Sequence, residues 1–135
     1  MNILTLDLPS RQDSVTEAAN ALTDALEQAG LPESLTFDVR LALQEALVNA
    51  VEHGNRLDET KQVHVTCDKT DDAVTLVVRD EGDGFDPGGV PDPTLPENIL
   101  REHGRGLFLM RRLCDEVRFN PKGNSVTVVK KIPRE

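Results

Sequence analysis

The segment LALQEALVNAVEHGN, residues 41–55, predicts a long helix with an apolar face and a polar edge. Together with Val39 just before it, the apolar residues Leu43, Ala46, Leu47 and Ala50 recur at helical spacing and form one stripe. Beside that stripe, Glu45, Asn49 and His53 are spaced four residues apart and stack along one edge. We therefore expect a helix over residues 34–52 whose polar edge borders the core.

The elements before this helix follow from alternation and from breaker residues. Residues 2–8 alternate apolar and polar, which predicts a strand that ends at Pro9. Ser10 is predicted to cap a second amphipathic helix that extends to about Gly30, and Pro32 reinforces the break.

The elements after it include short β-branched runs. Residues 63–67 and 74–78 predict a hairpin, and residues 104–117 predict a glycine-initiated helix. That helix is expected to run into a strand at 117–119, and SVTVVKKI, residues 125–132, predicts the closing strand. Grouped hairpins and helices favour an α+β two-layer sandwich, in which a mixed, mostly antiparallel sheet carries helices on one face.

Length and charge limit the possible functions. The 135 residues fit a single domain over 1–135, and a formal net charge of −9 argues against binding the phosphate backbone of nucleic acid. The N-terminus lacks a signal-peptide pattern, and no apolar run approaches the roughly 18 residues of a membrane span, so we expect a cytoplasmic protein that does not enter the membrane. Cys67 and Cys114 form no CxxC pair and are expected to be buried thiols.

Glu45 and Asn49 are the first candidate site residues. An amide oxygen beside phosphate oxygens suits Mg²⁺, and a carboxylate one turn away can accept a proton from an attacking hydroxyl. Taken alone, the same pattern also fits a solvated helix edge.

A second candidate segment is RDEGDGF, residues 79–85. Asp80 ends a predicted strand, where its carboxylate can accept a hydrogen bond from an exocyclic amine. Gly82 and Gly84 allow a ligand to approach the backbone closely, although an acidic turn has the same residues. The spacing does not fit a calcium-binding loop.

A third candidate segment is GRGLFLM, residues 104–110. Glycines at a helix start expose N–H groups that can bind phosphate, although a flexible junction would look similar. The segment is neither a Walker A motif nor a dinucleotide fingerprint. The Gly- and Pro-rich residues before it, about 86–103, predict a functional lid or a disordered stretch.

Together, E-x-x-x-N on a helix, D-x-G-x-G after a strand and G-x-G-L at a later helix resemble the N, G1 and G2 boxes of the Bergerat-fold (GHKL) ATP-binding superfamily. The match covers residues 41–128. The wording of EALVNAVEHGN, DEGDGFDP and GRGLFLMRRLCDEV is most similar to the anti-sigma factor serine kinases of bacterial partner-switching systems.

The resemblance implies a role for each matching residue. Glu45 would be the general base, and Asn49 would ligate Mg²⁺ on ATP. Asp80 would bind the adenine amino group in a pocket shaped by Gly82 and Gly84. The residues bordering the phosphates would be Gly104, Arg105, Gly106 and Leu107, and residues 86–103 would be the ATP lid.

The sequence departs from the family pattern in two places. The family often has a Thr pair in the last strand that reaches adenine through its hydroxyl and a water; here Ser125 would take that role, and Asn124 departs. The family also often has an Arg just before the G2 glycine; here Arg101 and Arg105 both remain candidates for the γ-phosphate. His53 fits either a phosphate or partner contact or a helix C-terminus.

The resemblance implies a protein serine kinase that phosphorylates a small STAS-type anti-sigma-factor antagonist and also sequesters a sigma factor, acting as a homodimer. Two alternatives are a non-catalytic, nucleotide-dependent binding module and part of a histidine-kinase system. The presence of Glu45 favours the kinase over the binding module. The lack of a dimerisation helix with a phosphoacceptor His argues against the histidine-kinase system.

Overall fold

The computed structural model of the chain describes residues 1–82 and 102–133. The elements in chain order are β1 (Asn2–Pro9), α1 (Gln12–Gln28), α2 (Glu33–Val48), the π-helix η1 (Asn49–Gly54), β2 (Gln62–Lys69), β3 (Ala73–Arg79), α4 (Glu102–Leu113), β4 (Glu116–Phe119) and β5 (Ser125–Lys131). The order of these elements agrees with the prediction from the sequence. Most of the proposed lid and Gly84 lie outside the described residues.

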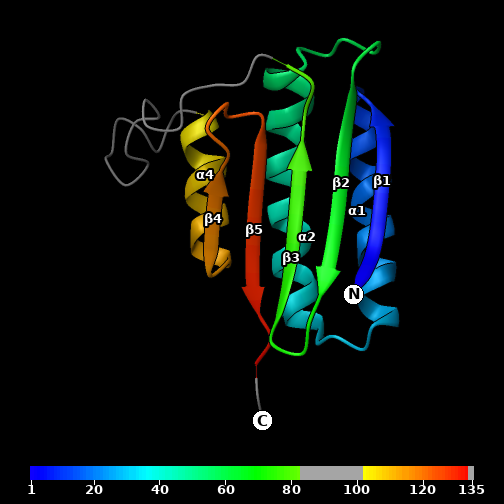
Figure 1. Cartoon of the computed structure of the whole chain (residues 1–135), viewed down its shortest axis with the longest axis vertical. Coiled ribbons are helices and arrows are strands. Elements are labelled where there is room, and N and C mark those ends of the chain that lie inside the picture. The colour runs from blue at the N-terminus through cyan, green and yellow to red at the C-terminus, as the bar shows by residue number, and fades with distance from the viewer. Residues whose placement is uncertain (83–101, 134–135) are drawn as a thin grey trace.

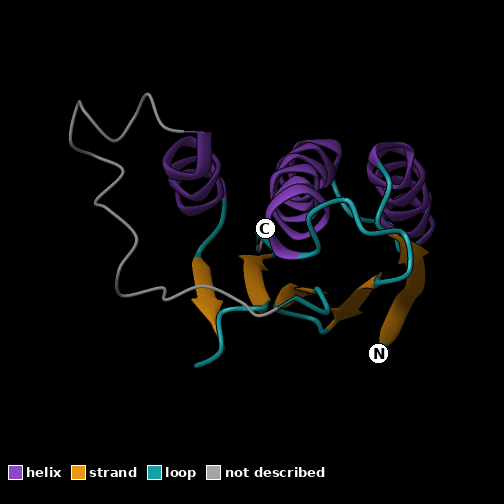
Figure 2. Cartoon of the chain, turned by 90° about the horizontal axis from the view of Figure 1, so that it is seen from above, coloured by secondary structure: helices purple, strands orange, loops and turns teal. Residues whose placement is uncertain are grey.

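The strands form one five-stranded sheet in the order β1-β2-β3-β5-β4 (Figure 1). All three long helices cover the same face of this sheet (Figure 2). The α+β two-layer sandwich is therefore confirmed. Every pairing between the described strands is antiparallel, so the sheet contains none of the parallel pairing that a mixed sheet would have.

The core lies between the two layers and is aliphatic, as a chain without Trp or Tyr requires. Alternate residues of β2 and β3 are buried, because side chains along a strand point to opposite faces. On the helix side the buried residues of α2 follow the predicted stripe, including Val39, Leu43 and Leu47. Cys67 and Cys114 are buried free thiols, and burial raises the pKa of Cys67 to about 12.

The predicted role of Ser10 as a helix cap is wrong. Arg11 holds the N-cap position of α1, and no side chain caps that helix. The Ser10 hydroxyl instead donates to the Lys61 carbonyl oxygen at 2.8 Å and accepts a hydrogen bond from Asn55 Nδ2 at 2.7 Å. Ser10 therefore ties the end of β1 to the segment that leads into β2, because tertiary partners outcompete the local cap.

The helix predicted over residues 34–52 changes from α-helical to π-helical winding at Asn49. It is α-helical to Val48 and continues as a π-helix to Gly54, where the Asn55 N–H bonds the Ala50 carbonyl oxygen at 2.8 Å. Such i→i+5 segments occur mostly as short insertions and often at functional sites. The sequence predicted a regular helix through this segment, so the π-helix is a structural finding.

The third helix begins earlier than expected. The sequence placed its start at Gly104, whereas α4 begins at Glu102, so Gly104 and Gly106 lie within the helix. The same boundary removes residues 102 and 103 from the predicted lid. Among the described residues, no helix has the length and apolar character needed to cross a bilayer.

Candidate functional site

Antiparallel pairing brings two segments together that are far apart in the sequence. Arg79, the last residue of β3, pairs with Ser125, the first residue of β5. Asp80 therefore lies beside Asn124, and its N–H donates to the Asn124 carbonyl oxygen at 2.9 Å. The end of β3 and the start of β5 thus form one wall of a site.

A cavity of about 400 Å³ opens at this edge, between the sheet and the π-helical end of α2. It brings together three residues that the sequence singled out: Asn49, Asp80 and Ser125. The remaining lining residues are Ala46, Ala50, Glu52, His53, Gly54, Arg56, Val78, Met110, Phe119, Gly123, Asn124 and Val126. Apolar side chains on two sides with few polar groups between them are typical of a small-molecule site.

Asp80 is the buried charge of the cavity, with 8% of its surface exposed. Its Oδ1 accepts a hydrogen bond from the Gly82 N–H at 2.8 Å. Burial raises the pKa of the Asp80 carboxyl, and the Gly82 hydrogen bond and the charges of Lys122 and Lys61 oppose that rise. Among residues 1–82 and 102–133 the Asp80 carboxylate has no ion pair, and it is suited to accept a hydrogen bond from a ligand amine.

Close backbone packing surrounds the Asp80 carboxylate. A Cβ at Gly54 would overlap that carboxylate, and a Cβ at Gly82 would overlap the Gly54 carbonyl oxygen. The close approach that Gly82 permits in this structure is that of the Gly54 backbone, and its role in letting a ligand approach stays a prediction. The sequence treated Gly54 only as part of a helix end, so its contact with Asp80 was missed.

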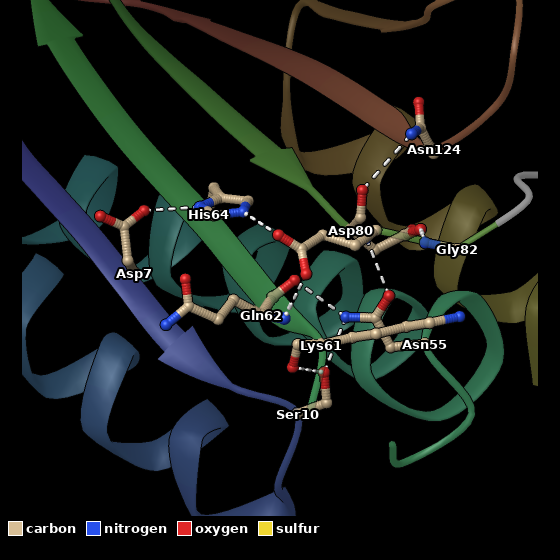
Figure 3. A network of polar contacts seen from close by, with 10 residues as sticks. Asp7, Ser10, Asn55, Lys61, Gln62, His64, Asp80, Gly82 and Asn124 are labelled. Carbon is tan, nitrogen blue, oxygen red and sulfur yellow. Dashed lines mark hydrogen bonds and ion pairs between the residues drawn. The ribbon is translucent and has the colours of Figure 1, made fainter. Parts of the chain in front are cut away.

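A buried amide connects the end of η1 to the loop that carries Asp80 (Figure 3). Asn55 is 1% exposed, and its Oδ1 accepts a hydrogen bond from the Glu81 N–H at 2.8 Å. Its Nδ2 donates to Ser10 Oγ at 2.7 Å and to the Gln62 carbonyl oxygen at 2.9 Å. One side chain therefore joins β1, β2 and the loop after β3.

The wall that carries Asp80 continues into a tight turn organised by Asn120. Its Oδ1 accepts from three successive backbone N–H groups, those of Gly123, Asn124 and Ser125. Its Nδ2 donates to Asn124 Oδ1 at 2.7 Å, and Asn124 Nδ2 lies 3.4 Å from the Asp80 carbonyl oxygen. Asn124, the position at which the sequence departs from the pattern of the Bergerat-fold family, is thus fixed beside Asp80.

The helix side of the cavity presents Asn49 and His53. Glu45 lies one turn before Asn49 and is partly exposed, but it is not among the lining residues. Within the described residues, neither Glu45 nor Asn49 makes a side-chain hydrogen bond or ion pair. The Asn49 amide is therefore available to a ligand from the cavity wall, and Glu45 stands next to it.

Some functional candidates were missed by sequence reasoning. Arg56 lines the cavity with a positive φ of 53°, and Leu57 follows with a φ of 60°. Two successive left-handed residues that are not glycine are uncommon and often mark functional segments. The sequence predicted the turn at Pro121–Gly123 but contained no signal for the left-handed conformation of Arg56 and Leu57 or for the hydrogen bonds of Asn55 and Asn120.

The remaining predicted positions are only partly described. Gly84 and Arg101 lie outside the described residues, as do the side chains at 104–107. Only the helical backbone is described for Gly104, Arg105, Gly106 and Leu107. Their proposed contacts with phosphate stay predictions.

The donor groups present indicate what the cavity can bind. Asp80 can accept a hydrogen bond from an amine at the buried end, and the Asn49 amide oxygen can ligate a hard cation. No group of three or more His, Cys, Asp or Glu side chains among the described residues could hold a metal ion by itself.

Sequence comparison with known proteins gives the family to which the chain belongs. Residues 8–130 match the family described as histidine kinase-like ATPase domain. Serine-protein kinase RsbW of Bacillus licheniformis is 37% identical over 105 residues, which are 73% of this chain and 66% of that protein. RsbW of Staphylococcus epidermidis is 31% identical over 95% of this chain and 86% of its own length, and RsbW of Bacillus subtilis is 30% identical over 93% and 82%. The chain therefore belongs to the histidine kinase-like ATPase domain family and, within it, to the serine-protein kinases of the RsbW type.

Proposed function

We propose that this protein transfers the γ-phosphoryl group of ATP to a serine of a small STAS-type anti-sigma-factor antagonist and that it also sequesters a sigma factor. The observation that carries the proposal is the meeting of Asn49 and Asp80, 31 positions apart in the sequence, on the wall of one cavity, with Glu45 one turn from Asn49. This is the arrangement expected if adenine binds at one end and phosphates at the other.

Adenine recognition is assigned to the buried end. Asp80 accepts a hydrogen bond from the adenine amino group, and Ser125, on the same wall, supplies a second polar contact. Guanine has a carbonyl oxygen where adenine has that amine, so it would face the Asp80 carboxylate acceptor to acceptor. The site is therefore expected to prefer ATP to GTP.

Magnesium fits the phosphate end. Mg²⁺ is bound in such sites by one or two protein oxygens together with phosphate oxygens and water, and the Asn49 amide oxygen supplies one protein ligand. When bound, the ion neutralises phosphate charge, which matters in a protein whose net charge is −9. Of the proposed phosphate contacts from Gly104 to Leu107, only Gly104 lies in the first turn of α4, where backbone N–H groups have no partner within the helix and could bind phosphate.

Glu45 is assigned as the general base. It accepts the proton of the substrate serine hydroxyl as the serine oxygen bonds the γ-phosphorus, and the bond from that phosphorus to the β–γ bridging oxygen breaks to release ADP. Glu45 lies outside the cavity lining, where a serine on a second protein can approach it. A module that only binds nucleotide and partner does not need this carboxylate.

The test is phosphotransfer to a candidate substrate. The protein is incubated with labelled ATP, Mg²⁺ and the antagonist encoded by a neighbouring gene, and the product is analysed for phosphoserine. The matched control is Glu33→Gln, which removes an exposed carboxylate at the start of α2. Partner binding without phosphoserine would instead establish the non-catalytic module.

The assembly is also part of the proposal. We expect a homodimer in which the kinase reaction switches which partner is held, without direct contact with nucleic acid. Sedimentation of the protein with and without each partner gives the stoichiometry. A monomer at micromolar concentration in every mixture would contradict the dimer.

A further inference from the structure

A histidine lies between two carboxylates at the edge of the sheet, next to the loop that carries Asp80 (Figure 3). His64 Nδ1 is 2.5 Å from Asp7 Oδ1, and its Nε2 is 3.0 Å from Glu81 Oε2. Asp7 comes from β1 and His64 from β2, whereas Glu81 directly follows Asp80. The cluster therefore spans two strands and the nucleobase loop.

This geometry requires the protonated ring. Ionised carboxylates only accept hydrogen bonds, and a neutral imidazole has one N–H donor and one acceptor nitrogen. Both contacts of His64 are favourable only when both nitrogens carry a proton. Loss of one proton leaves an unprotonated nitrogen facing a carboxylate oxygen, so at least one of the two contacts must open.

Glu81 transmits this state to the loop. Its Oε1 accepts from the Gln62 N–H at 2.8 Å, while its own N–H donates to Asn55 Oδ1 at 2.8 Å. Its neighbours are Asp80 and Gly82, which are themselves joined by a hydrogen bond. A change at the Glu81 carboxylate therefore acts on its two neighbours in the chain. These are Asp80, whose carboxylate is proposed to bind adenine, and Gly82, whose N–H donates to that carboxylate.

We propose that His64 is a positioning residue for the nucleobase loop and that the affinity for adenine nucleotide is higher when His64 is protonated. This rests on the proposed function of the cavity as an ATP site. No atom of His64 reaches the cavity lining, so it acts through Glu81 and not by contact with nucleotide.

The direction of the pH effect follows from the charges around the ring. The hydrogen bond to Asp7, and to a smaller extent the one to Glu81, raise the pKa of His64 above its usual 6.5. Two effects oppose that rise: partial burial of the ring and the positive charge of Arg79, the residue of β3 that pairs with His64. His64 is protonated at pH values well below this raised pKa and loses its proton as the pH rises through it. Nucleotide affinity is therefore expected to fall with rising pH in the range above 6.5.

The experiment is an NMR titration of the His64 ring in the full chain, first without ligand, then with saturating MgATP and separately with adenosine, which has no phosphate to titrate. His64→Gln identifies the signal among the three histidines. Because coupling is reciprocal, a higher affinity of the protonated form must appear as a higher His64 pKa in the complex. We expect an affinity difference of about fivefold, at the low end of usual couplings.

Glu81→Gln is the control that separates positioning from a long-range charge effect. It keeps the ring and the backbone N–H of residue 81 but removes the carboxylate that His64 holds. If His64 acts through Glu81, its pKa no longer responds to nucleotide in this variant. If the response persists, only the charge of the ring matters and the positioning role is overturned.

The outcomes for the wild type are distinct. A His64 pKa that is the same with and without bound nucleotide overturns this inference and leaves the ATP site intact. Failure of MgATP and adenosine to bind at any pH overturns the proposed function and this inference with it. A pKa that rises on binding in the wild type, but not in Glu81→Gln, supports the assignment.

Discussion

The two ends of the cavity differ in how fully the protein builds them. At the buried end, Asp80 is held by Gly82, Asn124 and, through Glu81, by Asn55. At the helix end, Glu45 and Asn49 are placed by the backbone of one helix and make no side-chain hydrogen bond among the described residues. The buried end is preorganised for recognition, and the helix end leaves its polar atoms for cation, phosphate and substrate. Changes at the two ends should therefore affect different measurements.

The largest effect is expected for Glu45→Gln. The amide cannot accept the serine proton, so phosphotransfer should fall by about 100-fold or more, while ATP affinity changes little. Single-turnover transfer and calorimetric ATP titration measure the two quantities separately, with Glu33→Gln as the control. Parallel loss of binding and transfer would show that the helix end also serves recognition, and the contrast between the ends would fail.

Asp80→Asn should have the opposite profile. The weaker hydrogen bond to the adenine amine should cost about 1–3 kcal/mol of ATP binding. The free energy of unfolding of the ligand-free protein should not fall, because burial already disfavours the charged carboxylate and an Asn oxygen can still accept from the Gly82 N–H. Calorimetry and urea unfolding test both parts, and equal wild-type affinities for GTP and ATP would remove Asp80 from this role.

Asn55→Ala tests whether the buried end depends on its support. The change leaves the Glu81 N–H without its partner at a partly buried position and removes two further hydrogen bonds. We expect a loss of about 1–3 kcal/mol in the free energy of unfolding, together with weaker ATP binding. Urea unfolding and calorimetry on the same sample give both values. An unchanged ATP affinity in the folded variant would confine Asn55 to a structural role.

The smallest effect is expected far from both ends. Lys130 Nζ lies 3.0 Å from Asp38 Oδ2 and donates to the Leu113 carbonyl oxygen, which joins α2, the end of α4 and β5. Asp38→Asn should lower the free energy of unfolding by less than about 1 kcal/mol, because the pair is partly exposed. Neither ATP affinity nor transfer should change. A change in ATP affinity in this variant would show that the cavity responds to packing throughout the domain.

The proposed ATP lid over residues 86–103 lies mostly outside the described residues. The lid over 86–103 is predicted to be ordered by MgATP more than by ADP, since only ATP offers a γ-phosphate contact. Hydrogen exchange on amides 86–107 in the apo, ADP and ATP states tests this. Equal exchange in all three states would contradict a nucleotide-dependent lid.

The predictable part of this molecule is what local pattern controls. Alternation and helical spacing gave the strands and helices within a few residues, because burial of one face imposes a period on the sequence. The same reasoning found Asn49 and Asp80, since a polar residue at the edge of an apolar stripe or at a strand end is visible in one dimension. It failed at Ser10, where the local rule for caps competed with partners 51 and 45 residues away.

The α+β class, the apolar faces and the polar residues that border them can be derived from the sequence, because they depend on neighbours within one or two turns or strands. Four features became visible only in the folded chain: the burial of Asp80 beside Asn124, the Asn55 contacts to the loop after β3, the π-helical winding of η1, and the position of His64 between Asp7 and Glu81. Those features depend on strand register and on hydrogen bonds between distant segments. No periodicity encodes them, because each is selected by the free energy of satisfying buried polar groups once the layers have packed.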